Sequence, residues 1–303
     1  MDKPYILDVK GNSLDDGPGI RTTIFFKGCP LSCIWCHNPE SKKVNQELSW
    51  DKETCIGDFG CLNICKKGAL SRENMGFVDR NKCERCFECA NFCPAKALTK
   101  VGEEMEIDEL VIKAASDIPF YRVSGGGVTL SGGEATMFPE WVGELSKTLH
   151  GKEIDILLET CGYFNYEKVR KYMLPYLKDI YCDLKIFNRD EHKKYCGVYN
   201  DLILENIRKM KENEKTFGYK LITRTPLIPN ITDTEENLNQ IADFLREIGM
   251  EKTVILPYNP TWYAKTEKIG AKLDDSLKEL NAFQDREHLE KAKNIFREKG
   301  ITC

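Results

Sequence analysis

The sequence lacks the features that mark secreted, membrane-spanning or nucleic-acid-binding proteins. No apolar run approaches the 18 residues of a membrane-spanning helix, and no charged segment followed by an apolar one forms a secretory signal at the N-terminus. The formal net charge of −4 leaves no basic excess that would attract nucleic acid. We therefore expect a cytoplasmic protein with no membrane partner and no nucleic-acid partner.

Cysteine, in contrast, is abundant and unevenly distributed. The 303 residues include 14 cysteines, and ten of them lie between Cys29 and Cys93. The cytosol keeps thiols reduced, so a disulfide framework is not expected. The crowding indicates metal ligands instead.

The first cysteine group is a loop over residues 28–40 that follows an apolar run. Cys29, Cys33 and Cys36 have the spacing C-x3-C-x2-C. Three thiolates can bind three irons of an iron–sulfur cubane, and without a fourth cysteine nearby in the sequence one iron stays open for an exogenous ligand. The alternative is a zinc knuckle in which His37 supplies the fourth ligand.

A second cysteine-rich segment, residues 50–100, contains an internal repeat. Its second half has the bacterial ferredoxin spacing C-x2-C-x2-C-x3-C-P, in which the fourth cysteine binds the other cluster. A shift of 28 residues aligns the first half with it, except that Asp58 stands opposite Cys86. Crosswise sharing assigns one cluster to Cys83, Cys86, Cys89 and Cys65, and the other to Cys55, Cys61, Cys93 and, as a hypothesis, Asp58.

Asp58 also has a simpler interpretation, as a turn residue between two glycines. A carboxylate is a harder ligand than a thiolate and binds iron less tightly in a sulfur-rich site. If Asp58 is a ligand, we expect a 4Fe–4S cluster that readily loses one iron to give a 3Fe–4S form.

The rest of the chain alternates between predicted strands and helices. We expect strands over residues 5–9, 20–27, 128–131, 154–160, 180–184, 220–225 and 253–257. We expect helices over 108–121, 139–149, 165–177, 201–214, 232–248 and 275–299, the fifth with a capping box from Thr232 to Glu235. Six β-α repeats predict a parallel sheet, too short to close as an eight-stranded barrel. The predicted fold is α/β: a partial (β/α)6 barrel from residues 1–49 and 101–303, with residues 50–100 inserted as a ferredoxin-like domain.

Polar or glycine residues follow every predicted parallel strand. Turns are commonly polar, so one such strand end means little, but six at the same edge of a sheet indicate a site. After the cysteine loop these residues are Gly132-Gly133-Glu134, Glu159-Thr160, Asp183-Leu184-Lys185, Arg224 and Tyr258-Asn259.

Several strings together resemble one enzyme family over residues 6–260. They are residues 16–23, 28–40, 129–134, 183–185 and 224–229. They are similar to the activating enzymes of glycyl radical enzymes, within the radical S-adenosylmethionine (SAM) superfamily. The segment 50–100 resembles the two-cluster insert of the subgroup that serves decarboxylases, dehydratases and lyases.

The resemblance implies an oxidoreductase that cleaves SAM reductively to a 5′-deoxyadenosyl radical. That radical would abstract a hydrogen from a glycine of a partner glycyl radical enzyme, with flavodoxin or ferredoxin as electron donor. The family would carry three iron–sulfur clusters, one binding SAM and two in the insert. The alternatives are a radical SAM maturase acting on another peptide or small molecule, and an iron–sulfur electron carrier.

The resemblance also implies which residues bind SAM. The open iron at Cys29, Cys33 and Cys36 would chelate its amino and carboxylate groups. The other implied SAM-binding residues are Trp35, His37, Gly132, Gly133, Glu134, Thr160, Asp183, Leu184, Lys185, Arg224 and Asn259. Glu159, Thr160 and Asp183 would frame a monovalent cation.

Two further points follow from individual residues. Asn259 stands where the family usually has histidine, and an amide cannot titrate. Cys161, Cys182, Cys196 and Cys303 are interpreted as buried or terminal thiols.

Overall fold

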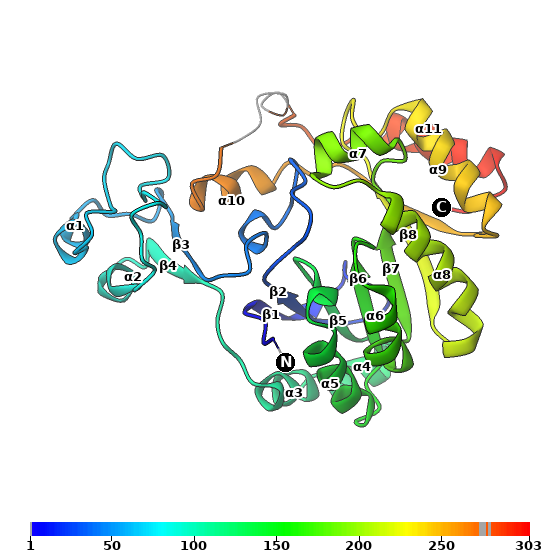
Figure 1. Cartoon of the computed structure of the whole chain (residues 1–303), viewed down its shortest axis with the longest axis horizontal. Helices are drawn as coiled ribbons and strands as arrows, with labels where there is room; N and C mark the ends of the chain where they lie inside the picture. Colours follow the sequence, from blue (N-terminus) through cyan, green and yellow to red (C-terminus); the bar gives the residue numbers. More distant parts are fainter. Residues whose placement is uncertain (1, 273–276, 278–279) are drawn as a thin grey trace.

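The computed structural model describes residues 2–272, 277 and 280–303. Its centre is a seven-stranded sheet in the order β1-β2-β5-β6-β7-β8-β9, in which β1 is antiparallel to β2 and all later neighbours are parallel (Figure 1). The strands are β1 (Ile6–Ser13), β2 (Arg21–Phe26), β5 (Gly127–Gly132), β6 (Ile156–Thr160), β7 (Asp179–Asp183), β8 (Lys220–Pro226) and β9 (Thr253–Leu256). This mixed α/β fold around a mostly parallel sheet agrees with the expected alternation and is consistent with a partial barrel.

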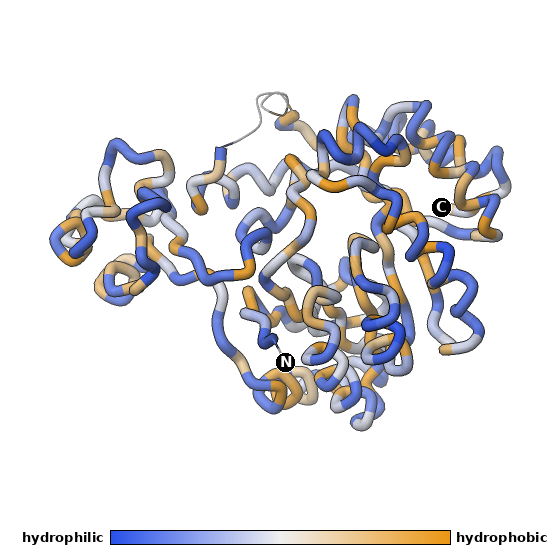
Figure 2. Tube along the Cα trace, viewed as in Figure 1, coloured by the Kyte–Doolittle hydropathy of each residue, from blue (hydrophilic) through white to orange (hydrophobic). Residues whose placement is uncertain are grey.

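Helices connect successive parallel strands and pack on the outside of the sheet (Figure 1). They are α3 (Ile107–Ala115), α4 (Ile118–Ser124), α5 (Pro139–His150), α6 (Tyr166–Tyr172), α7 (Arg189–Cys196), α8 (Asp201–Phe217), α9 (Glu235–Glu247), α10 (Trp262–Lys268) and α11 (Arg286–Glu298). Short 3₁₀ helices span Pro39–Ser41 (η1), Ala135–Met137 (η2) and Leu174–Tyr176 (η3). Figure 2 shows apolar and polar residues alternating around α9 and α11, as expected where one face packs on the core.

Three predicted helices differ from the structure. The helix expected over 108–121 is two helices, because Pro119 in the first turn of α4 lacks an N–H for a continuous ladder. α9 is capped by Thr234, whose hydroxyl accepts from the backbone N–H of Asn237, and not by Thr232. The last helix begins at Arg286, eleven residues later than expected; the first residues of the expected helix partly fall outside the described residues.

Two short helices, α7 and α10, were not expected from the sequence. α7 is largely polar, with only His192 and Cys196 buried, so it shows little amphipathic periodicity. α10 follows β9 and lies between the sheet and the cysteine-rich insert (Figure 1).

The insert forms a separate layer beside the sheet (Figure 1). The antiparallel strands β3 (Glu47–Trp50) and β4 (Leu98–Val101) close it at its base, and α1 (Gly60–Ile64) and α2 (Glu88–Phe92) lie beyond them. The 28-residue repeat recurs in the backbone: Phe59 and Phe87 both precede their helix in the left-handed conformation, with φ of 51° and 60°. A small apolar core of its own includes Leu48, Leu70, Phe77, Val78 and Leu98.

A buried ion pair joins the insert to the end of β2. Lys27 Nζ lies 2.9 Å from Glu47 Oε2, and it also donates to the carbonyl of Glu40 at 2.6 Å. Burial alone lowers the pKa of Lys27, and it opposes ionisation of Glu47 as well, but Lys43 and Lys27 hold the pKa of Glu47 below its usual value. The pair ties the cysteine loop, β2 and β3 together.

Candidate functional site

A cavity of about 290 Å³ opens at the C-terminal edge of the parallel sheet. Cys29, Cys33 and Cys36 line it, so the fold brings the three loop thiols to one space. Eight further residues named from the sequence also line it: Trp35, His37, Gly132, Gly133, Thr160, Asp183, Lys185 and Arg224. The six-strand pattern therefore describes a real cavity edge, as expected for parallel α/β folds.

The cysteine loop is held by backbone hydrogen bonds on both sides. The N–H groups of Gly28 and Cys29 donate to the carbonyls of Ser41 and Lys42, at 2.6 and 3.1 Å. On the other side, Ser32 N donates to the carbonyl of Cys196 at 2.9 Å, and Ile34 N donates to that of Tyr195 at 3.1 Å. These contacts fix the loop between η1 and the end of α7.

The two glycines after β5 are required by how closely this loop approaches. A Cβ on Gly133 would lie 2.1 Å from the carbonyl oxygen of Gly28, and one on Gly132, at φ 104°, would lie 2.4 Å from the nitrogen of Phe26. The glycines line the cavity, but the close contact they permit is with the cysteine loop. Their expected role against the cofactor is thus preceded by a role in seating that loop.

Glu134 is fully buried and does not line the cavity. Its carboxylate accepts from the backbone N–H of Cys161 at 2.7 Å and from the hydroxyls of Thr136 and Thr160 at 2.6 and 2.9 Å. It therefore braces β5 against the end of β6. The expectation that its side chain contacts SAM is corrected by this position.

Leu184 and Asn259 also lie away from the cavity wall. Leu184 is part of the apolar core and 1% exposed, because it alternates with Asp183 and Lys185 along the strand end. The Asn259 side chain accepts from the backbone N–H of Thr261 at 2.9 Å, which makes it a turn residue. The backbone of Tyr258 and Pro257 lines the cavity instead.

Four charged side chains form one network on the cavity wall. Arg224 Nε donates to Asp183 Oδ1 at 2.8 Å, and its Nη1 pairs with Glu159. Lys185 Nζ lies 3.1 Å from Asp183 Oδ2, and Ser131 donates to Glu159 at 2.6 Å. Every carboxylate oxygen of Glu159 and Asp183 thus already has a protein partner, so a monovalent cation there would have to replace one.

Burial and charge compete in this network. Burial opposes ionisation of all three groups. The opposite charges nevertheless raise the pKa of Lys185 and of Arg224 above their usual range and lower the pKa of Asp183. The network therefore stays fully charged near neutral pH, and it presents fixed cations and anions to a zwitterionic ligand.

Two cysteines outside the loop contact the loop cysteines, which the sequence did not indicate. Cys161 lines the cavity and its side chain hydrogen-bonds with Cys29, while Cys196 at the end of α7 hydrogen-bonds with Cys33. The bond from Cys196 lowers the pKa of Cys33 to about 7, although burial opposes this. A contact between residues more than 130 positions apart leaves no local pattern in the sequence.

The insert has two further cysteine-lined cavities. One is lined by Cys65, Cys83, Cys86 and Cys89, and the other by Cys55, Asp58, Cys61 and Cys93. These are the two ligand sets expected from crosswise sharing. Across the described part of the chain, no three His, Cys, Asp or Glu side chains converge as they would around a single metal ion. Each thiolate of an iron–sulfur cluster binds its own iron, so a cluster does not require that convergence.

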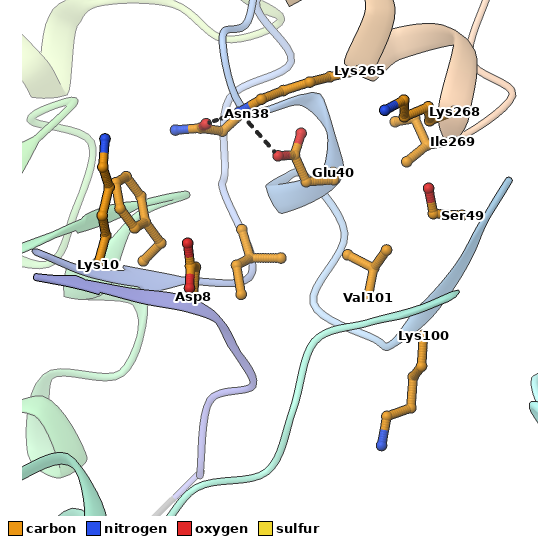
Figure 3. Close-up of a pocket in the computed structure, with 12 residues that line it drawn as sticks. Asp8, Lys10, Asn38, Glu40, Ser49, Lys100, Val101, Lys265, Lys268 and Ile269 are labelled. Atoms are coloured by element: carbon orange, nitrogen blue, oxygen red, sulfur yellow. Dashed lines mark hydrogen bonds and ion pairs between the residues drawn. The ribbon is translucent and has the colours of Figure 1, made fainter. Parts of the chain in front are cut away.

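A larger cavity, of about 520 Å³, adjoins the first (Figure 3). Asp8 and Lys10 of β1 line one side, and Lys265 and Lys268 of α10 line the other. Asn38 lines both cavities, and Lys265 Nζ bridges its side chain and Glu40 at 3.0 and 3.2 Å. The two cavities are therefore continuous at the cysteine loop.

No helix among the described residues is long and apolar enough to span a membrane. This agrees with the expected absence of a membrane-spanning segment in the sequence.

Comparisons with known proteins point to one superfamily. The family model described as the radical SAM superfamily matches residues 82–245, and one described as a 4Fe-4S single cluster domain matches residues 15–58. The indoleacetate decarboxylase activating enzyme of Tractidigestivibacter scatoligenes is 39% identical over 89% of this chain and 87% of its own length. The trans-4-hydroxy-L-proline dehydratase activating enzyme of Clostridioides difficile is 36% identical over 97% of this chain and 96% of its own.

A solved structure shares the fold. The radical SAM methyltransferase from Sphaerobacter thermophilus aligns with a TM-score of 0.54 over 98% of this chain and 76% of its own, at 15% identity. At that identity the likeness concerns the fold alone.

Proposed function

We infer the function from a shared premise: this chain belongs to the radical SAM superfamily, among the activating enzymes of glycyl radical enzymes. It is an enzyme that uses SAM and a 4Fe–4S cluster to generate a radical on a glycine of a partner protein. The observation that carries this function to specific residues is the single cavity lined by Cys29, Cys33, Cys36 and the charged strand ends.

The donor set of this cavity suits the two groups. Three soft thiols are placed to hold the cluster, with its fourth iron facing the cavity. Trp35 offers an aromatic wall, and Lys185 and Arg224 provide cations near the strand ends. When bound, the cluster and SAM supply the one-electron cleavage that yields a 5′-deoxyadenosyl radical, which takes a hydrogen atom from the glycine.

The protein's own residues orient and shield these groups. The charged network keeps Lys185 and Arg224 in place by pairing them with Asp183 and Glu159. Leu31 and Ile228 form an apolar part of the wall, and both are buried. A reactive radical is protected from water by such a wall.

We further propose that the partner's glycine loop reaches this site through the adjoining cavity along β1. That cavity is continuous with the first at Asn38, and it lies at an edge strand of the open sheet (Figure 3). Lys10 is exposed and forms no ion pair within the described residues, so it is available to an acidic or carbonyl-rich segment. A charge reversal, Lys10→Glu, should weaken activation of the partner without changing uncoupled SAM cleavage.

The insert is proposed to hold two further clusters in a ferredoxin-like arrangement. Its two cavities contain the two expected ligand sets, including Asp58 in the second. Spectra of Asp58→Cys test the aspartate. An iron count and electron paramagnetic resonance (EPR) signature identical to the unchanged protein would remove Asp58 from the ligand set.

Flavodoxin or ferredoxin is the proposed electron donor, with the insert clusters either relaying electrons or shaping the docking surface. Cys86 is the exposed cysteine of its ligand set, which places that cluster nearest to solvent. Replacing Cys86 and Cys89 in the folded protein separates the two roles. Unchanged turnover with a protein donor would argue against relay.

The partner itself is open between two classes supported by similar identities. Relatives at 39% and 36% identity are named for a decarboxylase and a dehydratase, so identity alone does not select one. The test incubates the reduced protein with SAM and each candidate partner without oxygen. A glycine-centred EPR signal on one partner supports the function, and SAM cleavage with no radical on any glycyl radical enzyme would contradict it.

A further inference from the structure

Two buried thiols that the proposed function does not use lie against two of the three loop cysteines. Cys161 follows β6, and its side chain hydrogen-bonds with Cys29. Cys196 ends α7, and its side chain hydrogen-bonds with Cys33. The thiols come from two elements far apart in the sequence, so the fold places one beside each of two neighbouring loop residues.

The backbone fixes both thiols in position. The N–H of Cys161 donates to the buried carboxylate of Glu134 at 2.7 Å, which also holds Thr160. The carbonyl of Cys196 accepts from Ser32 N at 2.9 Å, so α7 and the cysteine loop are joined one residue from Cys33. Neither sulfur can move far without breaking these bonds.

Both thiols are nearly inaccessible to water. Cys161 is 8% exposed and Cys196 is fully buried, in one apolar cluster that also contains Leu31, Trp35 and Ile186. Burial raises the pKa of Cys161, and the bond with Cys33 together with burial raises that of Cys196. Both therefore keep their proton as S–H donors, and a hydrogen bond in so apolar a setting is strengthened.

We propose that Cys161 and Cys196 are positioning residues that donate S–H hydrogen bonds to the thiolates of Cys29 and Cys33 and so raise the reduction potential of the cluster held there. The inference rests on the proposed function in one respect, that the loop holds an iron–sulfur cluster. A reduced cluster carries one more negative charge, part of it on its thiolate ligands. Donors to those sulfurs therefore stabilise the reduced form more than the oxidised form.

The test is a redox titration of the full, cluster-loaded protein followed by EPR without oxygen. The relevant signal is the one that changes when SAM is added, which separates this cluster from those of the insert. Cys161→Ala and Cys196→Ala each remove one donor, and Cys182→Ala is the control, a buried thiol on β7. At a fixed poise we expect each test variant to lower the ratio of reduced to oxidised cluster about tenfold, or about 59 mV for a one-electron couple, and the control to leave it unchanged.

Serine variants keep the test decisive if an alanine variant fails to assemble. Cys161→Ser and Cys196→Ser retain an O–H donor, so we expect iron content like that of the unchanged protein and a potential closer to it than to the alanine value. Equal potentials in all variants, or iron lost in the serine variants too, would overturn the proposal. If the unchanged protein shows no SAM-sensitive signal, the proposed function fails instead, so the two failures are distinguishable.

Discussion

Changing Arg224 to methionine should destabilise the folded protein by about 3 kcal/mol, because it leaves a buried carboxylate without its cation. Arg224 and Glu159 form an ion pair with side chains only 12% and 10% exposed, and Arg224 also bonds Asp183 at 2.8 Å. Removing one partner of a buried pair typically costs 3–5 kcal/mol. We take the lower end because Lys185 still neutralises Asp183.

The assay is thermal unfolding of variants with equal iron content, without oxygen. In a protein of this size 1 kcal/mol corresponds to a shift of about 2–4 °C, so we expect a fall of at least about 6 °C. Arg208→Met is the matched control, since Arg208 pairs with Glu247 at 2.9 Å but the side chains are 42% and 64% exposed. That change should cost about 1 kcal/mol or less.

A second variant separates the pair from general damage to the site. Combining Arg224→Met with Glu159→Gln removes the orphaned charge, so the double variant should melt above the single one. Equal melting temperatures for Arg224→Met and the Arg208→Met control would refute a buried, charged network.

Three further changes test separate parts of the structure. Gly133→Ala should displace the cysteine loop, since its Cβ would lie 2.1 Å from the Gly28 carbonyl oxygen, and we expect loss of the SAM-sensitive EPR signal. Burial lowers the pKa of His192, so the unfolded chain binds its proton more readily and stability should fall as pH drops below about 6.5; His192→Gln should reduce this loss in thermal melts at pH 7.5 and 5.5. Lys27→Met should cost about 3 kcal/mol in stability, because Glu47 is 6% exposed and would keep only a solvent-facing lysine.

Each of these changes has a control on the surface. Gly151→Ala places its Cβ at an ordinary 3.5 Å from the nearest atom and should leave the EPR signal intact. His150→Gln, at an exposed position, should keep the full pH dependence. Lys209→Met removes an exposed pair with Glu205 and should cost less than 1 kcal/mol. A test variant that behaves like its control contradicts the role assigned to that residue.

Much of the architecture could be predicted because its signals are local. Alternating strand and helix patterns, such as residues 220–225 followed by 232–248, predict the order of a parallel sheet. Parallel strands then place all their C-terminal ends at one edge, which gathered Asp183, Lys185 and Arg224 with the cysteine loop. The insert was equally legible, because its cysteine spacing repeats every 28 residues.

Other features depend on contacts that no local pattern records. Glu134 has the same sequence context whether it faces the cavity or braces Cys161, and only the packing of β5 against β6 decides between them. The contact of Cys196 with Cys33 depends on α7, a polar helix with weak periodicity. Asn259 serves its own turn, which follows from the local backbone after β9 and not from the strand-end pattern.

The most direct measurement is pulsed EPR of the reduced protein with SAM labelled by ¹⁵N in its amino group or ¹⁷O in its carboxylate. If an iron at the Cys29, Cys33 and Cys36 loop is open to the cavity, both labels should show hyperfine coupling to the cluster, and the coupling should vanish in Cys33→Ala. Bound SAM with no coupling from either label, or zinc at this loop, would contradict an open iron and with it the radical chemistry assigned to this site.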